Sequence, residues 1–170
     1  MVYSEKFGIR LVLLFVVGGL VISSSLWPIS YEKILGANSS HEISNKALLA
    51  DFYEEVYDNY NISALDKYLD INFTSATGAD KELFKEITNK SQGSFPNSTR
   101  TLINILADGD LVAVFNSWNA TFSGDNFMGA PANGNQFTTA TVDLFRLGDG
   151  KITEHWQIGD YSNFTKAVYG

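Results

Sequence analysis

The chain has 170 residues and a net charge of −7 at pH 7, with 12 Lys and Arg against 19 Asp and Glu. A hydrophobic fraction of 45% is typical of one globular domain and excludes wholesale disorder. The sequence contains no lysine- or arginine-rich cluster, so we expect no nucleic-acid partner. Because it has no cysteine and only two histidines, it excludes disulfides, thiol nucleophiles and multi-histidine metal sites, and we expect no metal.

The first apolar segment extends from Leu11 to Ile29 and contains 19 residues without a charge. A helix of this length crosses a bilayer core of about 30 Å, and Lys6 and Arg10 before it favour an N-terminus in the cytoplasm. The segment is either an uncleaved membrane anchor with Trp27 at the far interface or a cleaved signal peptide with residues 11–22 as its core. In both alternatives, residues 1–37 consist of an N-terminal cytoplasmic tail, the membrane or signal segment at about 11–29, and a linker. Both also predict a domain at 38–170 outside the cytoplasm, either membrane-anchored or secreted.

Potential glycosylation sites are frequent in the predicted exterior domain. Half of the 14 asparagines stand in an Asn-X-Ser/Thr motif, whereas the 27 Ser and Thr residues would create about two such sites by chance. Together with an export segment, this excess predicts a glycoprotein, the alternative being a chain that is merely rich in these residues. The predicted acceptors are Asn38, Asn61, Asn72, Asn89, Asn97, Asn119 and Asn163.

Three helices are predicted at the start of this domain. The first covers Ser44–Tyr60, where apolar and aromatic residues recur every three or four positions and Ser44 is the expected N-cap. Shorter helices are expected at Ser63–Leu69 and Asp80–Lys90. Tyr53 and Tyr57 lie four residues apart on the first helix. Their rings therefore either pack in the core or close a pocket with their hydroxyls.

From residue 99 onward the apolar period changes to two, which predicts strands. The expected strands are Thr99–Ala107, Leu111–Phe122, Gln136–Leu147 and Lys151–Ile158. The turn sequences Asp108-Gly109-Asp110 and Gly148-Asp149-Gly150 predict that the strands on either side of each turn pair as hairpins. Helices followed by an antiparallel sheet indicate an α+β fold.

Four motifs follow one another along this strand-rich part: DGDLVAV at 108–114, FMGAPANG at 127–134, VDLFR at 142–146 and DGKITEHW at 149–156. In this order they resemble the motifs of SnoaL-like polyketide cyclases, within the nuclear transport factor 2-like superfamily, and the resemblance spans about residues 44–170. It implies a cone-shaped fold in which three N-terminal helices pack on a strongly curved, mostly antiparallel sheet and close a pocket. It also implies a homodimer.

The candidate catalytic residue, Asp160, follows the last predicted strand. Regular alternation without a bulge puts one set of residues on one face of that strand: Ile152, Glu154, Trp156, Ile158 and Asp160. Asp160 could then lie in a dry cavity with a raised pKa, or it could merely end the strand by hydrogen-bonding loop backbone. The resemblance implies that an Asp here is the general acid/base of an intramolecular aldol ring closure, which requires neither cofactor nor metal.

Candidates for substrate contact come from the same alternation. If Asn119 carries a sugar and faces solvent, Asn116 and Trp118 face inward, either toward a pocket or into ordinary sheet packing. The predicted substrate-binding residues are thus Trp156, Asn116, Trp118, Tyr53 and Tyr57.

In each of two further pairs of polar residues, the two members are expected to face opposite sides of their strand. Glu154 and His155 point in opposite directions and form no dyad, so we interpret His155 as a surface or dimer-interface residue. Asp143 and Arg146 are interpreted as structural, and an Asp–Arg–Asp arrangement of these two with Asp160 is disfavoured for the same reason.

Two functions are compatible with these residues. The first is a cofactor-independent enzyme for aldol-type cyclisation or isomerisation of a small apolar carbonyl compound, with Asp160 as general acid/base. The second is a non-catalytic, exported module of the same fold for small-ligand binding or assembly. An exported location favours the second, because polyketide intermediates are generally handled in the cytoplasm. Replacing Asp160 by Asn distinguishes the two, since it abolishes turnover under the first and leaves binding nearly intact under the second.

Overall fold

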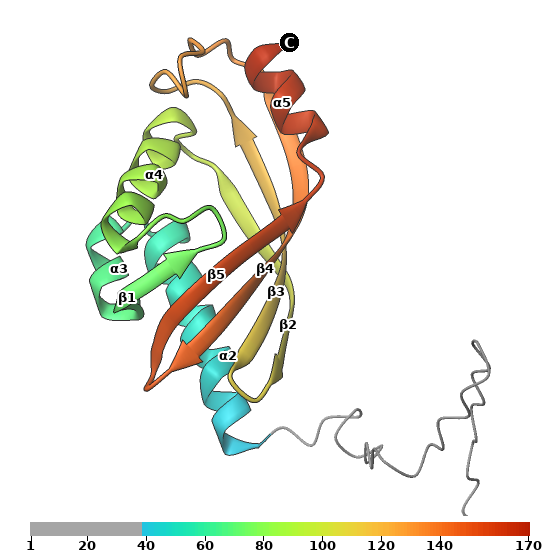
Figure 1. Cartoon of the computed structure of the whole chain (residues 1–170). Coiled ribbons are helices and arrows are strands. Elements are labelled where there is room, and N and C mark those ends of the chain that lie inside the picture. The colour runs from blue at the N-terminus through green and yellow to red at the C-terminus, as the bar shows by residue number, and fades with distance from the viewer. Residues whose placement is uncertain (1–38) are drawn as a thin grey trace, which may run out of the picture. The chain divides into compact units, whose positions relative to one another are not determined.

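A computed structural model describes residues 39–170, and the predicted membrane or signal segment at 11–29 and the acceptor Asn38 lie outside this range. Within 39–170, no helix combines the length and apolar character that a membrane crossing requires. The N-terminal elements are α2 (Ser40–Phe52), a π-helical continuation (Tyr53–Asp58), a 3₁₀ turn (Ile62–Ala64), α3 (Leu65–Tyr68), β1 (Leu69–Ser75) and α4 (Lys81–Ser94). There follow β2 (Thr99–Asp108), β3 (Leu111–Thr121), β4 (Gln136–Gly148), β5 (Lys151–Gly159) and α5 (Ser162–Tyr169) (Figure 1).

The first helix begins earlier than its apolar pattern predicted. Its N-cap is Ser39 and not Ser44, because Ser39 and Glu42 form a reciprocal capping box in which each side chain accepts from the other's backbone amide. The helix predicted at 63–69 is a 3₁₀ turn followed by α3, and the one predicted at 80–90 is α4, capped by Asp80. The strand β1 and the helix α5 are additions to the predicted elements.

Five strands form one mixed sheet in the order β1-β5-β4-β3-β2. β1 is parallel to β5, and the other neighbours are antiparallel. Both predicted hairpins are confirmed, since β2 pairs with β3 across Gly109 and β4 pairs with β5 across Gly150. Both glycines have the positive φ that such tight turns require. Figure 1 shows α2, α3 and α4 gathered on one side of this curved sheet, so the fold is α+β as predicted, with one parallel pair added.

A bulge in β5 changes the predicted alternation of that strand. Arg146 pairs with Glu154, but the next residue of β4, Leu147, pairs with Ile152, so β5 carries one extra residue at this point. Ile152 and His155, three positions apart, are consequently both buried. The prediction that Ile152 shares a face with Glu154 and Trp156 is therefore wrong, because it assumed a strand without a bulge.

The buried side chains form two apolar clusters. The larger one joins α2 to β3 and β4 and includes Val114 and Phe145, and the smaller one joins α5 to the other end of the same strands and includes Trp118 and Phe137. Along β3 and β4 the inward residues between these clusters are polar, namely Asn116, Asp143, Thr141 and Thr139. The core is thus interrupted at one level of the sheet, and this level holds the candidate site.

Candidate functional site

The carboxylate of Asp143, on the inner face of β4, is only 2% exposed and accepts four hydrogen bonds. Its Oδ2 accepts from the Tyr53 hydroxyl at 2.6 Å and from Asn116 Nδ2 at 2.7 Å. Its Oδ1 accepts from His155 Nε2 at 2.9 Å and from Gln157 Nε2 at 2.7 Å. A charge at this depth is tolerated because every face of the carboxylate meets a donor.

The electrostatics of this cluster keep Asp143 ionised. Burial raises the pKa of Asp143, but the hydrogen bond and charge of His155, the Tyr53 hydroxyl and the charge of Arg100 outweigh burial and hold the pKa below its usual 3.8. Burial and the neighbouring negative charge of Asp143 raise the pKa of Tyr53 well above its usual 10.0. At neutral pH the pair is therefore a carboxylate and a neutral phenol that donates to it.

A cavity of about 220 Å³ opens beside this cluster. Its walls come from the π-helical segment, α4, β2, β3, β5 and the start of α5, and consist of Tyr57, Phe84, Ile87, Thr88, Ser91, Gln92, Ser98, Arg100, Trp118, Phe127, His155, Gln157, Tyr161 and Phe164. No carboxylate is among these wall residues, which include one cation, Arg100, and one side chain that can act as a base, His155. An apolar compound with a polar or negatively charged group matches such walls.

His155 connects the cavity to the buried carboxylate. Its ring stacks on Phe145, with centroids 4.8 Å apart and an angle of 25° between the planes, and meets Phe84 edge-on at 5.4 Å. Because an ionised carboxylate only accepts hydrogen bonds, Nε2 must carry the hydrogen that bonds Asp143 whenever the imidazole is in its neutral form. Nδ1 then keeps the lone pair, and it makes no hydrogen bond with any residue of the described range. This arrangement is that of a general base whose tautomer is held by an acid.

Arg100 and Trp118 face each other across the β2–β3 pair. The guanidinium carbon of Arg100 lies 4.8 Å from the Trp118 ring centroid and 4.4 Å from that of Tyr57. Within residues 39–170, the Arg100 side chain has these ring contacts but neither a hydrogen bond nor an ion pair. Trp118 is 8% exposed, and its indole Nε1 is a buried donor without a partner.

Tyr57 offers the cavity a hydroxyl. It is half-buried, and its hydroxyl makes no hydrogen bond with the described part of the chain. Burial raises the pKa of Tyr57 to about 12, against the opposing charge of Arg100. The Tyr57 hydroxyl therefore stays protonated over the physiological range and can donate to a ligand oxygen.

Asp160 does not line this cavity. It is exposed, its Oδ1 accepts from the Ser162 amide at 2.9 Å, and this backbone hydrogen bond lowers its pKa. The predicted surroundings of Asp160, a dry cavity with a raised pKa, are therefore wrong. Its contacts correspond to the alternative considered from sequence, in which an acidic residue ends a strand by binding loop backbone.

The other sequence candidates divide into three groups. Tyr57 and Trp118 line the cavity, while Tyr53 and Asn116 lie behind it as partners of Asp143. Trp156 is half-buried, pairs with Leu144 and does not line the cavity, so the structure does not bring it to the other candidates.

The residues that the sequence interpretation missed are Asp143 and His155. His155 is 9% exposed, so its interpretation as a surface residue is wrong, and the cause is the bulge in β5. A signal for Asp143 was present, since it shares parity with the apolar Phe137, Phe145 and Leu147 and so marks a charge on the buried face. Arg146 lies on the opposite face of β4 from Asp143, as predicted, and forms ion pairs with Asp110 and Glu154 at the surface. In the described range, no three His, Asp or Glu side chains are grouped so that they could hold a metal ion.

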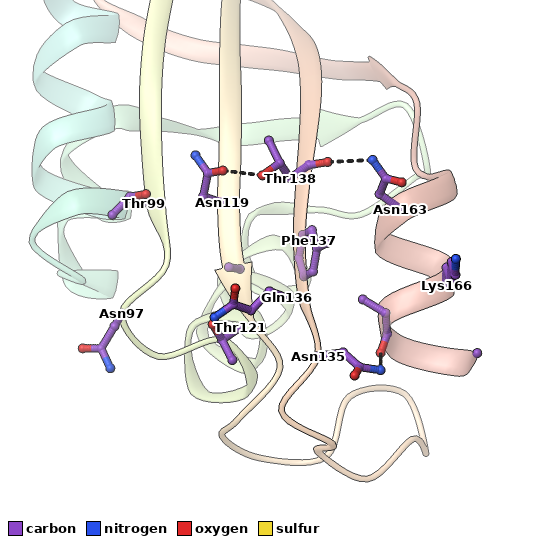
Figure 2. Close-up of a pocket in the computed structure, with 13 residues that line it drawn as sticks. Asn97, Thr99, Asn119, Thr121, Asn135, Gln136, Phe137, Thr138, Asn163 and Lys166 are labelled. Carbon is purple, nitrogen blue, oxygen red and sulfur yellow. Dashed lines mark hydrogen bonds between the residues drawn. The ribbon is translucent and has the colours of Figure 1, made fainter.

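A second hollow, an open groove of about 880 Å³, lies beside α5 and is lined mainly by amide and hydroxyl side chains (Figure 2). Asn97, Asn119 and Asn163, three of the predicted glycosylation sites, line it. The Thr138 hydroxyl donates to Asn119 Oδ1 at 2.5 Å, and Asn163 Nδ2 donates to the Thr138 carbonyl at 3.1 Å. The groove is the larger hollow, but Lys166 is the one ionisable side chain in its wall. We therefore assign the candidate chemistry to the smaller cavity.

Comparison with solved structures supports the fold. TsrD from Streptomyces laurentii is similar with a TM-score of 0.69 and 19% identity, over 77% of this chain and 98% of that one. A protein from Jannaschia sp. CCS1, described as a SnoaL-like polyketide cyclase, gives a TM-score of 0.71 and 18% identity, over 78% and 96% of the two chains. A SnoaL-like polyketide cyclase from Agrobacterium tumefaciens gives 0.60 and 17%, over 72% and 95%. At these identities the likeness concerns the fold alone.

The family follows from the sequence itself. No curated protein sequence matches the chain. The family model of the SnoaL-like polyketide cyclases, however, matches residues 47–168, which include every strand of the sheet and every residue named above as lining the cavity. The chain therefore belongs to the SnoaL-like polyketide cyclase family.

Proposed function

We propose that the chain catalyses proton transfer at a carbon next to a carbonyl group of a small, largely apolar compound, with His155 as general acid/base. The observation that carries this proposal is that His155, which lines the cavity, is hydrogen-bonded through Nε2 to the buried, ionised Asp143 behind it. Isomerisation and aldol-type cyclisation both begin with such a proton transfer.

The cavity residues can account for the proton and the electron pair throughout this step. His155 Nδ1 takes the proton from the carbon, the carbon–hydrogen electron pair becomes the enolate, and the imidazolium that forms is stabilised by Asp143 at 2.9 Å. The Tyr57 hydroxyl donates to the carbonyl oxygen as negative charge develops there. In isomerisation, His155 then returns the proton to another carbon of the conjugated enolate. In aldol-type cyclisation, the enolate carbon forms a bond to the carbon of a second carbonyl group, the π pair of that carbonyl becomes an alkoxide, and His155 returns the proton to the alkoxide oxygen. No redox change is involved, so the step calls for no redox cofactor.

The second candidate is a non-catalytic binding module that uses the same cavity. The observation that favours it is that Asp143 already has four hydrogen-bond donors, as a purely structural buried carboxylate would. The two candidates differ in whether the lone pair of His155 does chemistry.

The test is proton exchange at a simple ketone. We expect the full-length chain to accelerate deuterium incorporation next to the carbonyl of 2-tetralone in D₂O, followed by NMR, and His155→Gln to reduce the acceleration by about 10²-fold or more. Glutamine keeps a donor for Asp143 Oδ1 but cannot act as a base near neutral pH.

The matched variant is Asp160→Asn, whose side-chain oxygen can still accept from the Ser162 amide. Exchange that survives Asp160→Asn and is lost in His155→Gln supports the proposal. Exchange that survives His155→Gln and is lost in Asp160→Asn returns the role to Asp160, as the sequence first predicted. Binding of 2-tetralone without any acceleration of exchange favours the binding module.

We further propose that this domain works outside the cytoplasm as a glycoprotein. The six predicted acceptors within 39–170 are all exposed, which is what attached sugars require, whereas Asn45 and Asn116, which stand in no acceptor motif, are buried.

A further inference from the structure

The cavity contains a positive charge that the described part of the protein leaves without an ion-pair partner. The Arg100 guanidinium carbon lies 4.4 Å from the Tyr57 ring centroid and 4.8 Å from that of Trp118, and the Arg100 side chain makes no hydrogen bond or ion pair within residues 39–170. An arginine has five N–H donors, and a half-buried guanidinium without acceptors is costly unless something else supplies them.

The surrounding residues favour a negatively charged ligand as that acceptor. Among the residues that the structure describes, no Asp or Glu lines the cavity. The charge of Arg100 acts to lower the pKa of two acidic side chains, Asp143 and the exposed Asp58, but it forms an ion pair with neither. The oxygens of Asp143 are already occupied by hydrogen bonds from Tyr53, Asn116, His155 and Gln157. An added anion would therefore meet a cation without displacing an existing ion pair.

A second observation points to the same place. Trp118, on whose ring Arg100 lies, is 8% exposed, and its indole Nε1 is the one buried side-chain nitrogen or oxygen within 39–170 that has no hydrogen-bond partner. Buried donors in native proteins nearly always have an acceptor, so an orphaned one next to an unpaired cation indicates that an acceptor group belongs there. Both residues line the cavity.

The rest of the wall defines the other part of the ligand. Phe84, Ile87, Phe127 and Phe164 supply aromatic and aliphatic surface, and the 220 Å³ volume limits the ligand to a small molecule. We propose that the cavity takes a small aromatic or alicyclic carboxylate, with its carboxylate held by Arg100 and its apolar body against these side chains. The inference rests on the proposed function only in using the same cavity, and it narrows the substrate from a carbonyl compound in general to one that also carries a carboxylate group.

The test compares 2-naphthoate with its neutral isostere 2-naphthamide by isothermal titration calorimetry on the full-length chain. A charge-assisted arginine–carboxylate contact predicts that the unmodified chain binds naphthoate about tenfold or more tightly than naphthamide. In Arg100→Gln we expect the ratio of the two affinities to fall to about one while naphthamide still binds, which also shows that the variant is folded. Arg100→Lys keeps the charge without the planar fork and should retain part of the preference.

His155 provides the control that separates this inference from the proposed reaction. If His155→Gln loses proton exchange on 2-tetralone but keeps the preference for naphthoate, both proposals stand. If the unmodified chain shows the preference but no exchange, anion recognition stands and the reaction does not. Equal affinity for the two ligands, no binding of either, or a preference that survives Arg100→Gln overturns the inference.

Discussion

His155 Nε2 lies 2.9 Å from Asp143 Oδ1, and this bond runs diagonally between two strands. In the register of β4 and β5, Asp143 pairs with Gln157 and Phe145 pairs with His155, so His155 stacks on its direct partner and reaches past it to the carboxylate. Gln157 donates to the same Oδ1 at 2.7 Å from directly across. Because of the bulge between them, Ile152 and His155 share the inner face of the sheet, so the core-facing end of β5 continues into the strand segment that carries the bond to Asp143.

Asp143→Asn should destabilise the domain. Each carboxylate oxygen accepts two of the four hydrogen bonds, so the amide nitrogen that replaces one oxygen leaves two donors without their acceptor and facing its N–H groups. We expect the free energy of unfolding to fall by about 2–4 kcal/mol, measured by urea denaturation. Tyr53→Phe removes one donor and keeps the charge, so its loss should be smaller, about 1–2 kcal/mol. An unchanged urea midpoint in Asp143→Asn would show that the four bonds do not stabilise the fold.

Acid should weaken the fold through the same carboxylate. The pKa of Asp143 is lowered in the folded state, so its ionised form contributes stability above the unfolded-state pKa, and this contribution is lost as pH falls through the folded pKa. We expect the free energy of unfolding to decrease as pH is lowered from about 5 to about 2, and Asp143→Asn to flatten that decrease.

Glu42 offers a comparison for this acid dependence. Its pKa is also lowered, by hydrogen bonds from the backbone amides of Ser39 and Gly109, but the residue is exposed and its interactions are screened by solvent. Glu42→Gln should therefore flatten the acid dependence less than Asp143→Asn does. A larger effect of Glu42→Gln would contradict the weight given to the buried cluster.

Gly124 holds the loop after β3 against the end of α4, which forms one wall of the cavity. A Cβ at Gly124 would lie 1.9 Å from the Gly93 carbonyl oxygen and 2.8 Å from Pro96 Cδ, so Gly124→Ala must push the loop away from the helix. We expect a loss of about 2 kcal/mol or more in the free energy of unfolding. Gly148→Ala is the matched control, because its nearest contact is the Thr153 methyl at 3.3 Å, and it should cost less than about 1 kcal/mol. Equal losses would mean that the close approach at Gly124 is relieved without cost.

Glycosylation should be detectable at the groove of Figure 2. Expressed as the full chain in a glycosylating host, the protein should migrate faster on a denaturing gel after each of Asn97→Gln, Asn119→Gln and Asn163→Gln. Asn104→Gln is the control, since Asn104 is exposed but stands in no acceptor motif. If the three variants migrate like the unmodified chain, the acceptors of the groove carry no sugar.

Much of the fold was predictable because its signals are local. The hairpins at Gly109 and Gly150 depend on a few residues that favour positive φ, and the α4 N-cap at Asp80 depends on one side chain and one amide. The strand β1 was harder to predict, because it pairs in parallel with β5 and has no turn sequence that joins it to its partner. The start of α2 was misjudged by several residues, since its apolar pattern begins after its capping box.

The site was predictable only in part. Alternation in β3 correctly turned Asn116 and Trp118 inward, and helical spacing brought Tyr53 and Tyr57 to one region, the first behind the cavity and the second in its wall. The prediction from alternation failed in β5 because of one bulged position. With Ile152 facing the core, regular alternation predicted that Trp156 and Asp160 also face inward, whereas the bulge puts His155 on the inner face. Since side chains alternate with a period of two, a single extra residue is enough for this error.

The sequence by itself therefore determined the family, the helix-then-strand order and the absence of thiol chemistry, because these follow from motifs, local periodicity and composition. Only the tertiary structure decided which side chains meet. Tyr53, Asn116 and His155 come from three segments that are far apart in the sequence. The sheet register together with the bulge brings them to the buried carboxylate of Asp143, which lies on a fourth segment. The cost of burying that charge is offset only when all of its donors are in place, which is a property of the assembled fold and not of any one segment.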